Sequence, residues 1–76
     1  KDLLITSQLK VALLSNKQVS MANYQINTVN QIIFIFGIAK SDSEKREVIN
    51  EAKIIPDVKN IDASIFLVSE LSKNKK

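Results

Sequence analysis

The sequence of 76 residues has no cysteine, histidine or tryptophan, and it has one glycine, Gly37, and one proline, Pro56. Without cysteine and histidine there is no thiol nucleophile, imidazole base or disulfide, and nearly every type of zinc site is excluded. A single glycine excludes glycine-rich phosphate loops and the GxxG clamp of KH domains. No apolar run is long enough to span a bilayer. We therefore expect a protein that is not an enzyme and uses no metal or cofactor.

The composition is that of a globular chain, with 45% hydrophobic and 25% charged residues. Its formal net charge of +3 comes from the C-terminal end, which contains Lys73, Lys75 and Lys76, whereas residues 1–72 hold equal numbers of basic and acidic groups. We expect one folded domain over residues 1–69 and a basic tail or linker over 70–76. Because the folded part is close to neutral, we expect no nucleic-acid partner.

The spacing of apolar residues predicts a first helix over residues 3–15. Asp2 is a good N-cap for it, and Asn16 suits a left-handed residue at its C-terminal end. The side chains expected to face the core are Ile5, Leu9, Ala12 and Leu13.

A second helix is predicted to begin with a capping box formed by Ser41 and Glu44 and to end near Ile55, before the proline. Its core-facing residues are expected to be Val48, Ile49, Ala52 and Ile55. Its glutamates at helical spacing are Glu44, Glu47 and Glu51. Since basic residues are interleaved with them, we interpret them as a solvated face rather than as an acid/base or metal site.

Three strands are predicted, over residues 24–28, 32–39 and 58–68. Asn30 and Gln31 separate the first two, which indicates a hairpin. The segment 32–39 is apolar at odd and even positions alike, as in a central strand. A right-handed crossover would lay the third strand parallel to the second. The fold class is therefore α+β, in the order α-β-β-α-β, with a mixed three-stranded sheet and two helices on one face.

The sheet face opposite the helices is expected to display an apolar patch. Its members are expected to be Val29, Ile33, Ile35, Phe66 and Val68. Either neighbouring side chains or the tail cover this patch, or it is a docking surface for a partner or sister domain.

The first helix has a second, smaller amphipathic face. Leu3 and Leu14 lie nearly opposite its core-facing stripe, beside Lys10 and Lys17. Lysines bind anionic headgroups and leucines insert at the interface, so these four residues are candidates for contact with an anionic phospholipid membrane. Alternatively, the two leucines lie at frayed helix ends or pack on a neighbouring domain.

The order and spacing of several residues resemble the BON domain, named for bacterial osmotically inducible and nodulation proteins, over Asp2 to Val68. The residues that match the family pattern are Asp2, Ile5, Leu9 and Leu13, then Phe36 and Gly37, then Ala52, Ile55, Val58, Ile61 and Ile65. Family members usually have glycine at two positions that hold Gln31 and Asp57 here. Gly37 is retained, and we expect it to relieve crowding where the strand leaves the sheet.

The resemblance implies a role in the cell envelope. BON domains occur, often in tandem, in periplasmic and outer-membrane lipoproteins and are regarded as phospholipid- or membrane-interacting modules without enzymatic activity. It implies location in the periplasm, associated with the outer membrane, and a membrane surface, a sister BON domain or an envelope protein as partner. Some relatives suggest a monovalent ion, for which this sequence has no readable ligand set. A protein-interaction module that supports outer-membrane assembly or envelope integrity is the alternative function.

Overall fold

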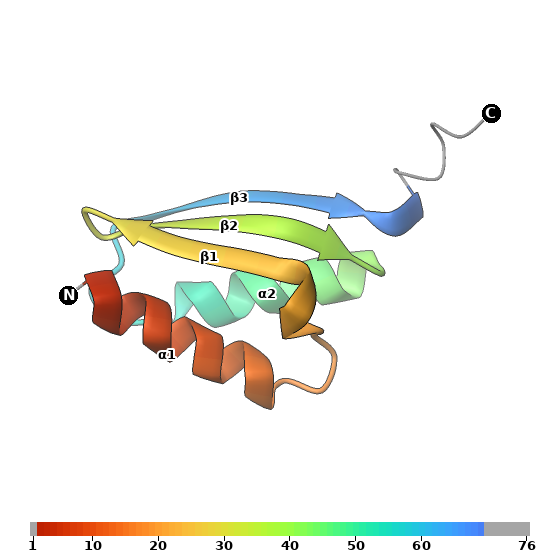
Figure 1. The fold of residues 1–76 in the computed structure, drawn as a ribbon, viewed down its shortest axis with the longest axis horizontal. Helices are drawn as coiled ribbons and strands as arrows, with labels where there is room; N and C mark the ends of the chain where they lie inside the picture. Colours follow the sequence, from red (N-terminus) through yellow and green to blue (C-terminus); the bar gives the residue numbers. More distant parts are fainter. Residues whose placement is uncertain (1, 70–76) are drawn as a thin grey trace.

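The computed structural model describes residues 2–69 and has the predicted order of elements (Figure 1). The elements are α1 (Asp2–Ser15), a 3-10 turn η1 (Met21–Asn23), β1 (Tyr24–Val29), β2 (Ile32–Ala39), α2 (Asp42–Lys53) and β3 (Asn60–Leu67). The sheet order is β1-β2-β3, with β1 antiparallel and β3 parallel to the central β2. Both helices lie on one face of the sheet. The predicted α+β class is therefore confirmed, while the tail predicted over 70–76 lies outside the described residues.

A two-residue turn sets the register of the β1–β2 hairpin. Asn30 and Gln31 have φ angles of 52° and 66°, the left-handed conformation that the tightest hairpins require at both turn positions. The Asp2 carboxylate accepts hydrogen bonds from the backbone N–H of Asn30 at 2.9 Å and of Gln31 at 2.8 Å. Asp2 thus joins the start of α1 to the hairpin turn.

The predicted exposure of Ile33 and Ile35 is wrong. Both side chains are buried beneath the helices, with 0% and 1% of their surface exposed. The register explains the error, because it pairs Ile33 with Thr28 and Ile35 with Ile26, and partners across a hairpin share one face. The outward residues of β2 are instead Phe34, Phe36 and Ile38.

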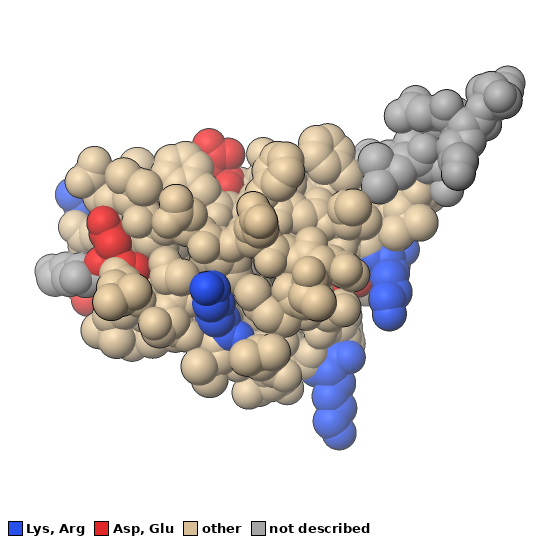
Figure 2. Space-filling view, viewed as in Figure 1, with Lys and Arg blue, Asp and Glu red and all other residues tan. Residues whose placement is uncertain are grey.

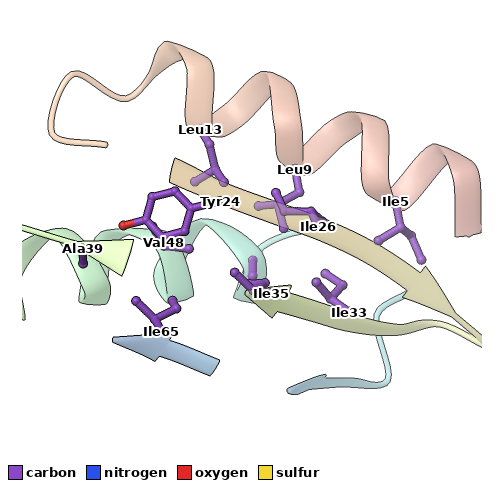
Figure 3. Packing of buried hydrophobic residues seen from close by; sticks show 11 residues of the cluster. Ile5, Leu9, Leu13, Tyr24, Ile26, Ile33, Ile35, Ala39, Val48 and Ile65 are labelled. Carbon is purple, nitrogen blue, oxygen red and sulfur yellow. The ribbon is translucent and has the colours of Figure 1, made fainter. Parts of the chain in front are cut away.

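The core lies between the sheet and both helices (Figure 3). Ile5, Leu9 and Leu13 of α1 point toward the sheet, as predicted from their spacing. The buried apolar residues are Ile5, Leu9, Leu13, Tyr24, Ile26, Ile33, Ile35, Ala39, Val48, Ala52 and Ile65. Burying each large aliphatic side chain contributes about 1.5–3 kcal/mol, so this cluster is the main source of stability.

Gly37 relieves crowding as expected, but it does so inside β2, between Tyr24 and Ile65, and not where the strand leaves the sheet. It has no positive φ, but a Cβ built on it would lie 2.5 Å from the carbonyl oxygen of Asn23 and would overlap the ring of Tyr24. Gly37 is the register partner of Tyr24. The missing side chain therefore lets the Tyr24 ring and the η1 backbone lie against β2.

Glu44 is buried, so its assignment to a solvated face is wrong. Its Oε1 accepts from the Lys40 N–H at 2.8 Å, and its Oε2 accepts from the Ser20 N–H at 3.1 Å and the Tyr24 hydroxyl at 2.9 Å. Ser41 Oγ accepts from the Glu44 N–H at 3.3 Å, which is one half of the predicted capping box. Glu44 therefore connects the loop before η1, the start of β1 and the end of β2 to the start of α2.

The other two glutamates of α2 bind Asn16. The Asn16 amide Nδ2 donates to Glu47 Oε1 and to Glu51 Oε2, each at 3.0 Å, while its Oδ1 accepts from the Gln18 N–H. Asn16 does not have the positive φ expected from the sequence. Its side chain instead connects the end of α1 to α2.

The predicted ends of α2 and β3 differ slightly from the observed ones. The helix ends at Lys53 with Ile54 as its C-cap, rather than near Ile55, and β3 begins at Asn60 rather than at residue 58. Asp57, in the connection, has a φ of 68°. The Gln31 side-chain amide donates to the Asp57 carbonyl at 2.8 Å, so the hairpin turn also supports this connection.

Candidate interaction surfaces

The outer side of α1 presents an apolar surface that we call the α1 arc. It consists of Leu3, Leu4, Val11 and Leu14, whose side chains are 80%, 59%, 62% and 71% exposed. At about 100° per residue these four positions fall within one arc of roughly 100°. Leu3 and Leu14 were predicted to be exposed, whereas Leu4 and Val11 were not, although the same helical spacing places all four together.

Two lysines accompany the α1 arc. Lys10 is exposed on α1, and Lys17 is exposed just beyond its end. Neither makes an ion pair within residues 2–69. Figure 2 shows separate basic side chains among mostly uncharged residues on this view of the molecule. All four predicted lipid-contact residues are therefore accessible to solvent, and the exposed aliphatic surface beside them is larger than expected.

The uncovered face of the sheet forms a second apolar surface, the open sheet face. No described helix lies over it (Figure 1). Its exposed large residues are Val29, Phe34, Phe36, Ile38 and Phe66. Phe36 and Phe66 pack edge to face, with ring centroids 6.3 Å apart and an interplanar angle of 85°. Val29 and Phe66 are thus exposed on this face as predicted, and the phenylalanines of β2 replace Ile33 and Ile35. Val68 is exposed as well, but it follows the end of β3 and is not part of the sheet.

The buried side-chain nitrogen and oxygen atoms of the described region all have hydrogen-bond partners. Glu44 is the most enclosed: burial alone would raise its pKa, but the hydrogen bonds from Lys40, Ser20 and Tyr24 hold that pKa below its ordinary value. Burial, together with the bond to Glu44, raises the pKa of Tyr24 far above its ordinary value. At neutral pH, Glu44 is therefore a carboxylate and Tyr24 a phenol, and the hydrogen bond between them stabilises the fold.

Within residues 2–69 no group of three acidic, histidine or cysteine side chains is arranged to hold a metal ion. None of the helices in this region has the length and apolar character needed to cross a bilayer. The two apolar surfaces and the lysines that make no ion pair are exposed features of the same region.

Comparison with known proteins finds a relative of uncharacterized function. No family model matches the sequence. An uncharacterized protein in the gshII 5′ region of Anaplasma centrale is 33% identical over 60 residues, which are 79% of this chain and 40% of that protein. The chain thus spans less than half the length of this relative. The name of the relative states no activity, and any function of the whole protein is a matter for proposal.

Proposed function

We propose that the protein is a non-catalytic module of the bacterial cell envelope that binds anionic phospholipid through the α1 arc, Lys10 and Lys17. The observation that carries this proposal is the exposure of four large aliphatic side chains on one arc of a helix, next to a lysine without a partner. The arc would lie at the level of the acyl chain boundary. The lysines would contact the phosphate groups.

The expected affinity is low. Each lysine near an anionic membrane contributes about 1 kcal/mol, and each CH₂ group that leaves water contributes about 0.8 kcal/mol. A single helix face with two lysines therefore gives reversible binding. Such binding suits a module that is repeated or tethered in a longer protein.

Membership of the BON family is part of this proposal. It is supported by the α-β-β-α-β order and by the conformation of two residues. Gln31 and Asp57 stand where family members usually have glycine, and both have a positive φ, at 66° and 68°. The backbone here thus has the conformation for which glycine is best suited. Periplasmic location and association with the outer membrane follow from this membership as expectations.

Co-sedimentation with vesicles tests the proposed function. We expect binding to vesicles that contain phosphatidylglycerol, no binding to pure phosphatidylcholine vesicles, and loss of binding in the double variant Lys10→Glu/Lys17→Glu. Leu14→Ser should also weaken binding. Ile54→Ser is the matched control, because Ile54 is as exposed as Leu14, at 74%, but follows α2. Absence of binding to anionic vesicles at low ionic strength would contradict the proposal.

A second candidate function is protein interaction through the open sheet face. The edge-to-face pair of Phe36 and Phe66, exposed on a face that no described helix covers, favours it. The occupant would be a second domain of the same fold, as in a tandem protein. Sedimentation velocity tests this function: self-association that Phe36→Glu abolishes supports it, and a monomer at all accessible concentrations contradicts it.

A further inference from the structure

A groove runs along the free side of β3, between that strand and α2. It has a volume of about 530 Å³. Ile49 and Lys53 of α2 form one wall, and Val58, Lys59, Ile61 and Ala63 form the other. The four apolar residues are only partly buried and pack against the edge of the core. The groove thus has an aliphatic floor that is accessible from solvent.

The strand that borders this groove has an unoccupied edge. Within residues 2–69, β3 pairs with β2 alone. The backbone N–H and C=O groups of every second β3 residue therefore point away from β2, beyond the edge of the sheet. The Asn60 side chain accepts a hydrogen bond from the Ile61 N–H at 2.9 Å and covers the first of these positions. At Ala63, further along, no such side-chain bond is made. A strand edge beside a helix is the arrangement at which extended peptides add to a sheet.

The charges on the groove favour one kind of peptide. Lys53 and Lys59 are exposed and make no ion pair within the described residues, and the groove lining contains no carboxylate. Asp62 is exposed on β3, where strand alternation directs it toward the open sheet face. The chain's own C-terminal residues are rich in lysine and have the wrong sign of charge. Charge complementarity therefore selects an acidic segment from a partner.

We propose that this groove binds an extended, acidic peptide segment, which adds to β3 as a fourth strand. The peptide backbone would bond to the outward groups of β3. Apolar side chains of the peptide would pack on Ile49, Ile61 and Ala63, and acidic side chains would pair with Lys53 and Lys59. This site is separate from the α1 arc and does not depend on membrane binding.

Fluorescence anisotropy with the full chain tests the proposal. The probe is a fluorescein-labelled octapeptide of alternating valine and glutamate, at physiological ionic strength. We expect saturable binding that is weakened at least about tenfold, a loss of about 1.4 kcal/mol, in Lys53→Glu/Lys59→Glu. The double variant Lys10→Glu/Lys17→Glu is the control with the same change of charge and should bind the peptide like the wild type. Circular dichroism verifies that both variants are folded.

Two further probes separate strand addition from attraction between charges. A peptide of the same sequence with N-methylated backbone amides keeps its charge but cannot donate hydrogen bonds to β3, and we expect it to bind at least about tenfold more weakly. Amide shifts in ¹⁵N NMR spectra should change at Lys59–Ala63 on addition of the unmodified peptide. Equal affinity for the methylated peptide, or equal affinity of the Lys53→Glu/Lys59→Glu variant, would overturn the proposal, as would absence of binding.

Anionic vesicles provide the last arm of the test. Lys53→Glu/Lys59→Glu should still co-sediment with phosphatidylglycerol vesicles if the groove serves a peptide and not a membrane. Selective loss of vesicle binding in this variant, with binding retained in Lys10→Glu/Lys17→Glu, would overturn the peptide assignment and the α1 arc together. Failure of vesicle binding alone would affect only the proposed function.

Discussion

At the scale of single residues, Glu44 is the most deeply buried polar side chain of the described region. Its side chain is only 3% exposed, and three donors from different parts of the chain bind its carboxylate. A buried carboxylate is stable only when such bonds replace its hydration. Glu44 therefore stabilises the fold in its charged form, and we expect it to make stability sensitive to acid.

Replacing Glu44 by glutamine should lower the free energy of unfolding by about 2–3 kcal/mol at neutral pH, since a neutral amide is a weaker acceptor and brings an unwanted donor. Because the pKa of folded Glu44 lies below the ordinary value of 4.5, the stabilisation is present above about pH 4.5 and is lost as the pH falls through the folded pKa. The difference between wild type and Glu44→Gln should shrink accordingly in urea denaturation at a series of pH values.

Tyr24→Phe is the graded control for this experiment. It removes one of the three donors to Glu44 and keeps the ring, so it should lower the free energy of unfolding by less than Glu44→Gln does. A difference between wild type and Glu44→Gln that stays constant from about pH 7 to about pH 3 would contradict the assigned role of the carboxylate.

Gly37 is the second residue whose identity is dictated by its surroundings. Gly37→Ala should lower the free energy of unfolding by about 1–3 kcal/mol, because the new Cβ meets the Asn23 backbone and the Tyr24 ring. Gln25→Ala, on the exposed side of the neighbouring strand, should change stability by less than about 0.5 kcal/mol. Guanidinium denaturation measures both, and equal stability of Gly37→Ala and wild type would show that the Tyr24 contact is not tight.

At the scale of elements, Asp2 stabilises the hairpin in addition to the turn residues themselves. The carboxylate accepts from both turn amides, and the Thr6 and Thr28 hydroxyls bond at 2.6 Å further along α1 and β1. Asp2 was predicted as a helix N-cap, whereas it lies in the first turn of α1 and binds a turn 28 and 29 residues away. No spacing rule within a helix could reveal a bond between two distant segments.

Asp2→Ala should lower the free energy of unfolding by about 1–2 kcal/mol, because two turn amides lose a charged acceptor. Hydrogen exchange at the Asn30 and Gln31 amides should accelerate more than exchange in β2. Asp62→Ala, which removes an exposed carboxylate without a hydrogen bond in the described region, is the control and should change stability by less than about 0.5 kcal/mol. Unchanged exchange at both turn amides in Asp2→Ala would contradict the role of Asp2.

The order of elements was predictable from the sequence because the periodicity of apolar residues changes clearly between helices and strands. The prediction of which β2 side chains point toward the helices was wrong, because residues 32–39 are apolar at odd and even positions alike. The necessary signal was nevertheless present. Ile26 stands between the polar residues Gln25 and Asn27, an alternation typical of a strand with one buried face, and a two-residue turn at Asn30 and Gln31 pairs Ile26 with Ile35. Applying the register of the hairpin would have placed Ile35 in the core and Phe36 outside.

The interaction surfaces were predictable only in part. Leu3 and Leu14 were predicted from helical spacing, and the same spacing also places Leu4 and Val11 on the exposed side of α1, opposite the core-facing residues. The burial of Glu44 was not predictable from a charged helix pattern, because its partners come from loops whose path the sequence does not reveal. Long-range polar contacts are thus the part of this fold that sequence patterns describe least.

At the scale of the whole molecule, the two apolar surfaces face in opposite directions. The α1 arc lies on the side of the helix layer, and the open sheet face lies on the other side of the sheet (Figure 1). A membrane at the arc would therefore leave the open sheet face and the β3 groove accessible. The shape of the molecule thus allows a membrane and protein partners to be bound at the same time.

Single-tryptophan fluorescence tests the central claim, that the α1 arc is the membrane-binding surface, most directly. The sequence has no tryptophan, so Leu14→Trp and Phe36→Trp each report on one surface. On addition of phosphatidylglycerol vesicles we expect the emission of Leu14→Trp to shift to shorter wavelength, while that of Phe36→Trp stays unchanged. A shift in Phe36→Trp alone, or in neither variant, would contradict the claim.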